Sequence, residues 1–154
     1  MINYKIWTLC MVQRGDEVLL LDRQHDHFKG FIPPGGKVEF PESITAAAIR
    51  EVKEETGLDV HSLVYKGLYE YVNTTKKARY MIFNYLTTDF SGTLIEDSVE
   101  GKAMWVKIAD AEKLPMQTSI RRRFPLFFEE GTFEIQVEWN EEKNCEGAVH
   151  IRRT

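Results

Sequence analysis

The chain has 154 residues, of which 43% are hydrophobic and 29% are charged, a composition typical of one globular domain with a buried core. Its formal net charge of -4 at pH 7 argues against a dedicated binder of nucleic acid or membrane surfaces, because such proteins neutralise phosphates with a surplus of Lys and Arg. We therefore expect residues 1–154 to form a single domain that binds a small ligand.

The two cysteines and the N-terminal segment bear on the compartment. Cys10 lies in an apolar run and Cys145 near the C-terminus, without metal-ligand spacing or a disulfide framework, which indicates a reducing compartment. No stretch approaches the roughly 18 apolar residues of a membrane span, and the N-terminus lacks a basic segment followed by a long apolar core. The expectation is a cytoplasmic protein with no membrane partner.

The first half of the chain predicts a hairpin, a loop and a helix. Residues 3–13 and 17–23 are rich in β-formers and are joined around a glycine, which predicts two antiparallel strands. The segment 28–37, FKGFIPPGGK, has prolines and glycines where neither a helix nor a central strand could continue, so we expect a shaped loop. A helix over 43–56 follows, with Ser43 suited to its start and Gly57 to its end.

The second half predicts further strands and two helices. Residues 59–73, 79–88 and 103–108 are rich in β-branched and aromatic residues, with a polar turn at 73–77. Helices are expected at 109–114 and 118–129, and strict alternation over 133–139 predicts a late strand. The total is a mixed β-sheet flanked by helices.

The predicted helix 43–56 carries acids on its apolar side. At about 100° per residue, Glu51, Glu54 and Glu55 project from the same arc as Ala47 and Ala48. Burying an unpaired carboxylate costs several kcal/mol, and close like charges raise each other's pKa. A hard divalent cation would neutralise them, and Mg²⁺ prefers carboxylate oxygens, whereas the absence of clustered His or Cys disfavours zinc.

A simpler interpretation is that these acids form a solvated charge run. Arg50 and Lys53 stand at helical spacing to pair with them. The preceding loop favours a site, because a Pro-Pro-Gly-Gly-Lys segment can bring backbone oxygens near an ion, and backbone amides and Lys37 near phosphates.

Taken together, the two elements resemble a known motif. The segment 36–42, GKVEFPE, followed after seven residues by 50–58, REVKEETGL, resembles the complete Nudix box. The resemblance implies an α/β/α sandwich, with a mixed β-sheet flanked by helices, and a hydrolase acting on phosphoric anhydride bonds. It also implies a box that binds Mg²⁺ or Mn²⁺.

The resemblance assigns roles to residues of the box. By position, the metal ligands would be the carboxylates of Glu51, Glu54 and Glu55 and the Gly36 carbonyl. Arg50 would orient these acids, and Glu42 would pair with Arg50.

Two further residues outside the box resemble parts of MutT-type members of the family. The segment 98–106 resembles a loop and strand that supply another acid, for which Glu100 is the candidate and Glu96 and Asp97 are rivals. Glu100 would bind metal or act as base, unless it is an ordinary exposed carboxylate. Arg23 resembles an arginine that contacts phosphate, with an ordinary surface arginine as the alternative. The general base stays open between Glu54, Glu55 and Glu100.

The same resemblance suggests a substrate class. The best match is the MutT-type (d)NTP pyrophosphohydrolases, including 8-oxo-dGTP diphosphatases, which release a nucleoside monophosphate and pyrophosphate. A purine base could stack on an aromatic ring, for which the candidates are Trp7, Phe31, Phe83 and Tyr85.

Other functions stay open. The run Arg121-Arg122-Arg123 invites an RNA 5′-pyrophosphohydrolase, although a polynucleotide partner is disfavoured by so short a basic run. Hydrolases of another nucleoside diphosphate compound and a non-catalytic nucleotide sensor are further alternatives. The sequence leaves open whether the protein is a monomer or a homodimer.

Overall fold

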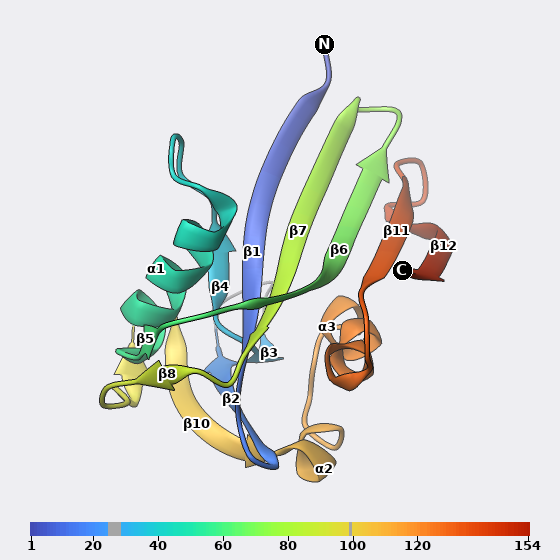
Figure 1. Ribbon diagram of the computed structural model, residues 1–154. Helices are drawn as coiled ribbons and strands as arrows, with labels where there is room; N and C mark the ends of the chain where they lie inside the picture. The colour runs from blue at the N-terminus through green and yellow to red at the C-terminus, as the bar shows by residue number, and fades with distance from the viewer. Residues whose placement is uncertain (25–28, 99) are drawn as a thin grey trace.

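The computed structural model describes residues 1–24, 29–98 and 100–154 and is dominated by one large sheet (Figure 1). Phe28, at the start of the predicted loop, and Val99 lie outside the described residues. The sheet order is β12-β11-β6-β7-β1-β2-β10-β9, with β3 added to β2 and β4 added to β1. Its strands are β1 (Asn3–Arg14), β2 (Glu17–Arg23), β3 (Gly30–Ile32), β4 (Gly35–Lys37), β6 (Val64–Asn73), β7 (Ala78–Thr87), β9 (Asp97–Ser98), β10 (Gly101–Lys107), β11 (Phe133–Asn140) and β12 (Cys145–Arg153).

The sheet is mixed, as expected. β1 runs parallel to β7 and β11 runs parallel to β6, while the other pairs are antiparallel. A separate two-stranded pair is formed by β5 (Asp59–Val60) and β8 (Phe90–Ser91). The helices are α1 (Ile44–Thr56), α2 (Ile108–Ala111), α3 (Thr118–Arg123) and the 3₁₀ helix η1 (Phe124–Phe128).

The segment predicted as a loop contains two short strands. Gly30–Ile32 pairs with β2, and Gly35–Lys37 pairs with β1. A Cβ at Gly35 would clash with the carbonyl oxygen of Thr8, so the two backbones approach closely because residue 35 has no side chain. Glycine usually disfavours a strand, but the missing side chain of Gly35 is what permits β4 to pair with β1.

Other boundaries also differ from the prediction. The expected strand 59–73 is divided, because residues 61–63 lie outside both β5 and β6. The predicted helix 109–114 is the single turn α2, and the predicted helix 118–129 changes to 3₁₀ at Phe124, next to Pro125, which lacks an N–H for the α-helical ladder. The late strand 133–139 is confirmed and extends to Asn140, and β12 pairs with it as a final hairpin.

Helix α1 begins and ends close to the predicted residues. The Ser43 hydroxyl accepts a hydrogen bond from the Ala46 N–H over 3.1 Å, which caps the first turn. Gly57 ends the helix in the left-handed conformation at φ 80°, and its N–H donates to the Lys53 carbonyl. Residue type alone predicts both caps.

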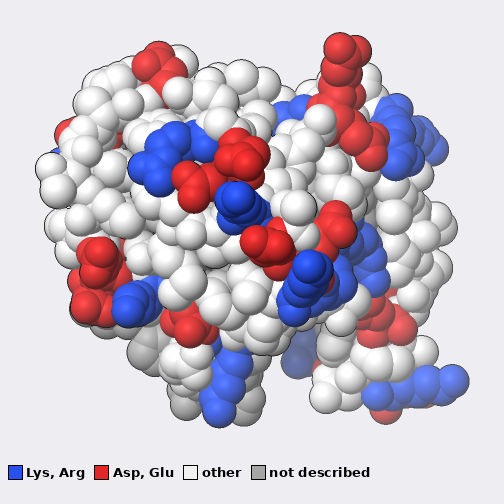
Figure 2. Space-filling model, turned by 90° about the horizontal axis from the view of Figure 1, so that it is seen from below, with Lys and Arg blue, Asp and Glu red and all other residues white. Residues whose placement is uncertain are grey.

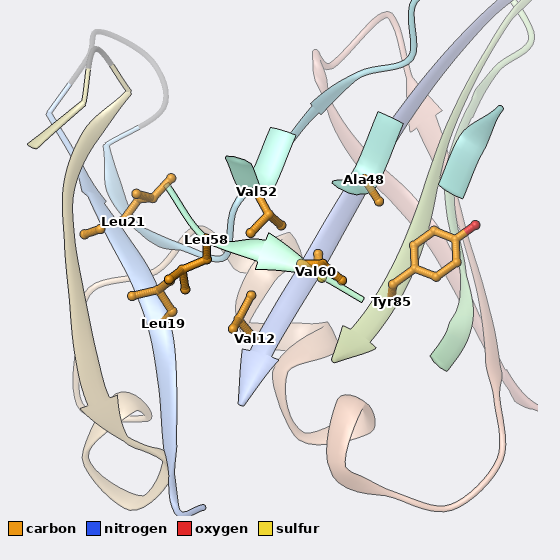
Figure 3. Close-up of a cluster of buried hydrophobic side chains, with 10 residues drawn as sticks. Val12, Leu19, Leu21, Ala48, Val52, Leu58, Val60 and Tyr85 are labelled. Atoms are coloured by element: carbon orange, nitrogen blue, oxygen red, sulfur yellow. The ribbon is translucent and has the colours of Figure 1, made fainter. Parts of the chain in front are cut away.

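The core lies on both faces of the sheet, because alternate residues of β1 point to opposite sides. Cys10 and Val12 join a cluster under α1, which also contains Ala48 and Val52 (Figure 3). Leu9 and Met11 belong to the cluster under α3 and η1. The two faces are thus covered by different helices.

Two sequence expectations concern the cysteines and membrane spans. Cys10 is buried and Cys145 exposed, and both are free thiols. Within the described ranges, no helix is long and apolar enough to cross a membrane.

Candidate active site

The three acids of α1 differ in exposure. Glu55 is buried, with 4% of its surface exposed, and the side chain of Glu51 is 14% exposed. The side chain of Glu54 is 58% exposed and is ion-paired with Arg50 at 3.2 Å. The expectation of three inward acids is therefore wrong for Glu54, which stands at the edge of the apolar arc and turns toward solvent.

Strand β4 brings two glycines against the inward acids. The Gly35 N–H donates to Oε2 of Glu55 over 3.4 Å. A Cβ at Gly36 would clash with the carboxyl group of Glu51, so this carboxyl lies in space that only glycine leaves open. The loop and the helix predicted from sequence thus meet at these four residues.

The close pair of acids perturbs Glu55. Burial, a hydrogen bond with Glu51 and the negative charges of Glu51 and Glu100 raise the pKa of Glu55 to about 9. The carboxyl is then protonated at neutral pH. Two carboxyl groups this close favour the binding of a cation, because a cation would replace the proton that now lies between Glu51 and Glu55.

Arg50 links the acids to the loop. It donates to both carboxyl oxygens of Glu42, at 3.0 and 2.7 Å, to Glu51 at 2.9 Å, and to the Lys37 carbonyl at 3.0 Å. The hydrogen bond from Arg50 lowers the pKa of Glu42 to about 2, and that same contact raises the pKa of Arg50. The predicted Glu42–Arg50 pair is present in the structure, and Arg50 fixes both the loop and one inward acid.

The residues expected outside the box converge on the same end of the site. Arg23 lies 3.4 Å from Glu100, and Glu100 is close enough for its charge to raise the pKa of Glu55. The Lys37 side chain is exposed. Glu96 and Asp97, the rivals to Glu100, are also exposed.

The described acids do not form a preassembled metal-binding site. Within residues 1–24, 29–98 and 100–154, no three acidic, His or Cys side chains converge as a metal site. Arg50 holds Glu51 and Glu54, and Glu54 faces solvent. Glu54 would have to leave Arg50 to join an ion, whereas Glu51 accepts from Arg50 through Oε1 and has Oε2 left for an ion.

The four aromatic candidates fall into two groups. Tyr85 is buried in the cluster of Figure 3, against which Phe83 packs, and Phe31 packs against the cluster under α3, so these three act as core residues. Trp7 is partly exposed and meets Tyr80 edge-on, with 5.7 Å between ring centroids. Phe31 and Phe83 are exposed to a similar, intermediate degree, but Trp7 is the one of the four that is not among the residues of the described core clusters.

The three arginines that suggested an RNA track have structural contacts. Arg121 donates to the carbonyls of Glu112 and Leu114, and Arg122 pairs with Glu146. Arg123 is 2% exposed and donates to the side chain of Asn84. On the face of the molecule shown in Figure 2, Lys and Arg side chains are interspersed with Asp and Glu side chains. The run Arg121–Arg123 therefore does not form a continuous basic surface.

Comparison with known proteins settles the family. The sequence profile of the NUDIX domain matches residues 4–127. The chain belongs to the Nudix family. The Nudix hydrolase YvcI of Bacillus subtilis is 32% identical over 112 residues, which cover 71% of this chain and 70% of YvcI. Membership in this family confirms the expected enzyme class, a hydrolase of the pyrophosphatase type.

Other Nudix relatives differ in the substrate that their names give. YtkD of Bacillus subtilis, provisionally named an 8-oxo-dGTP diphosphatase, is 42% identical over 71 residues, which cover 46% of this chain and 42% of YtkD. Further relatives are named for ADP-ribose and NAD-capped RNA. The crystal structure of the MutT protein from Bacillus halodurans has a TM-score of 0.82 at 27% identity, covering 96% of this chain and 97% of that one. The Nudix fold is thus shared over almost the whole chain.

The sequence did not indicate one residue of the candidate site, Gly35. Gly35 contacts Glu55 through its N–H, whereas the sequence pointed only to Gly36. The signal was present in the doubled glycine, since two adjacent residues without side chains suggest close approach on both sides of a strand.

Proposed function

We propose that the chain is a Mg²⁺-dependent MutT-type pyrophosphohydrolase that cleaves a nucleoside triphosphate, such as 8-oxo-dGTP or another purine dNTP, to the monophosphate and pyrophosphate. Mn²⁺ is the expected substitute ion. The observation that carries the proposal is the acidic pair Glu51–Glu55, held between α1 and the two glycines of β4.

The donor set of this pair fits a hard divalent cation. Carboxylate oxygens and waters are the ligands that Mg²⁺ prefers, and it commonly shares its shell with substrate phosphates. Glu51 and Glu55 would hold the ion, joined by Glu100 and by Glu54 once it leaves Arg50. The ion would displace the proton of Glu55.

The strand register supports Gly35 over Gly36 as the carbonyl ligand. The bonds from Cys10 N to the Pro34 carbonyl and from Val38 N to the Ile6 carbonyl flank the pair Thr8–Gly36. Hydrogen-bonded pairs alternate in an antiparallel ladder, so the Gly36 carbonyl faces β1. The N–H of Gly35 points instead to Glu55, and its carbonyl shares that edge.

The reaction we propose is in-line attack of water on an internal phosphorus. A bound divalent ion lowers the pKa of water and neutralises charge on the phosphate oxygens. Arg50 holds Glu51 in place, and Arg23, beside Glu100, would contact a phosphate together with Lys37. The proton of the attacking water would pass to Glu54, Glu55 or Glu100.

Trp7 favours a substrate that contains a nucleobase. Its ring is partly exposed on β1, and in the register it lies opposite Lys37, a proposed phosphate contact. Aromatic rings hold nucleobases by stacking. Trp7 and Lys37 point to the face of the sheet opposite the Glu51 carboxyl, so a base on Trp7 would lie next to β4 with its phosphates reaching across β4 to the acids.

The test is pyrophosphate release with Mg²⁺ across purine dNTPs, 8-oxo-dGTP, ADP-ribose and triphosphorylated RNA. We expect a dNTP to be the best substrate, and Glu54→Gln to lower turnover by about 100-fold or more while the fold is retained. A clear preference for RNA or ADP-ribose would overturn the substrate class. Nucleotide binding without hydrolysis of any compound would indicate a sensor and overturn the enzymatic proposal.

A further inference from the structure

A buried hydroxyl next to the acidic pair has no hydrogen-bond partner. Thr8, in the middle of β1, is 2% exposed, and its Oγ1 is buried without a partner among the described residues. Buried polar atoms in folded proteins are nearly always paired, and each exception calls for a reason. A bound ion or water is one such reason.

The register places this hydroxyl beside the Glu51 carboxyl. Thr8 is the direct partner of Gly36, and side chains of paired residues point to the same face of a sheet. On that face, the space above Gly36 is filled by the carboxyl of Glu51. Cys10, two residues along the same face, packs in the cluster under α1, so Thr8 also lies on the side of β1 that faces this helix.

The two residues directly opposite Thr8 on the neighbouring strands offer its hydroxyl no polar side chain. Gly36 has no side chain, and the residue opposite Thr8 on β7 is Phe83, whose ring is apolar. A valine would fill the same volume without burying an unpaired hydroxyl. A threonine at this position therefore costs stability unless the hydroxyl is used in another state of the protein.

We propose that Thr8 is a positioning residue of the metal site, whose hydroxyl donates a hydrogen bond to the Glu51 carboxylate, directly or through one water, when the divalent ion is bound. The inference rests on the proposed metal site at Glu51 and Glu55. Outer hydrogen bonds of this kind orient carboxylate ligands and set their affinity for the metal.

The test compares Thr8→Val, which removes the hydroxyl, with Thr8→Ser, which retains it. Mn²⁺ affinity is measured by calorimetry and by the electron paramagnetic resonance signal of the free ion, and the melting temperature is measured in EDTA. We expect Thr8→Val to lower Mn²⁺ affinity by about tenfold, to melt in EDTA at the same or a higher temperature, and Thr8→Ser to recover most of the affinity.

Thr87 provides the matched control, because it is also a buried strand threonine, but its hydroxyl donates to the Ser62 carbonyl over 2.7 Å. Thr87→Val should lower the melting temperature and leave Mn²⁺ affinity unchanged. If the wild type binds Mn²⁺ and Thr8→Val binds it equally well, the role of Thr8 is wrong while the metal site stands. If the wild type binds no Mn²⁺, both proposals are overturned.

Discussion

The carboxyl group of Glu51 lies in the space that a side chain at Gly36 would fill. A methyl group there would push the carboxyl away from β4, and because the obstacle is the end of a flexible side chain, the backbone has no need to move. We predict that Gly36→Ala folds with a nearly unchanged melting temperature but loses Mn²⁺ binding and at least about 90% of its turnover.

Gly35→Ala is the contrasting variant. Its Cβ would meet the Thr8 carbonyl oxygen and the Leu9 Cα, both of them backbone atoms that cannot turn aside. We expect a large loss of thermal stability there, measured by circular dichroism. If Gly35→Ala and Gly36→Ala lowered the melting temperature equally, the backbone clash at Gly35 would not be more damaging than the side-chain clash at Gly36, against the prediction.

The raised pKa of Glu55 predicts how stability depends on pH in the metal-free protein. The folded chain holds a proton on Glu55 up to about pH 9, whereas the unfolded chain loses it near the ordinary value of 4.5. Between these values the folded state binds more protons, so stability falls as the pH rises. We predict a steady decrease of the melting temperature in EDTA from pH 5 to about pH 9 that is weaker in Glu55→Gln.

Metal should reverse this trend, because the ion competes with the same proton. Mn²⁺ affinity should rise with pH over the same interval, and calorimetry in buffers of different ionisation enthalpy should detect proton release on binding. A pH-independent affinity with no proton release would refute the assignment of the proton to Glu55.

Much of this fold could be predicted from local signals. The caps Ser43 and Gly57 define α1 because they satisfy helix ends through their own atoms, and the alternating segment from Phe133 defines β11 through its two faces. The strand at Gly35–Lys37 could not be predicted in this way. It depends on β1 being close enough for backbone pairing, which residue types at 35–37 do not encode.

The site was predictable to a similar extent. The helical angles predicted Glu51 and Glu55 as inward acids. Glu54 adopts the side-chain rotamer that pairs with Arg50 and faces solvent, and the angular position of a residue on a helix does not determine its rotamer. The unpaired hydroxyl of Thr8 has no sequence signal, since threonine is common in strands. The Arg50–Glu54 pair is a local contact four residues apart on one helix, whereas the environment of Thr8 depends on tertiary contacts.

Arg50 holds the loop and the helix together by a geometry that lysine cannot reproduce. Its Nε and Nη2 reach the two oxygens of Glu42 while Nη1 reaches Glu51. Lys has a single nitrogen for these partners. We predict that Arg50→Lys lowers turnover and Mn²⁺ affinity by at least about tenfold, whereas Arg153→Lys, at an exposed pair with Glu129, changes neither. Wild-type kinetics in Arg50→Lys would show that the charge alone suffices.

Trp7 is the residue on which base recognition is proposed, and its variants separate binding from chemistry. Loss of one stacking partner costs about 1–3 kcal/mol per base, so Trp7→Ala should raise KM for the preferred nucleotide by roughly 5- to 150-fold with kcat little changed, and Trp7→Phe should recover part of it. Trp139, which meets Tyr71 edge-on on β11, supplies the control Trp139→Ala, for which we expect an unchanged KM. If the two alanine variants raised KM equally, or if Trp7→Ala lowered kcat alone, the base would have to bind elsewhere.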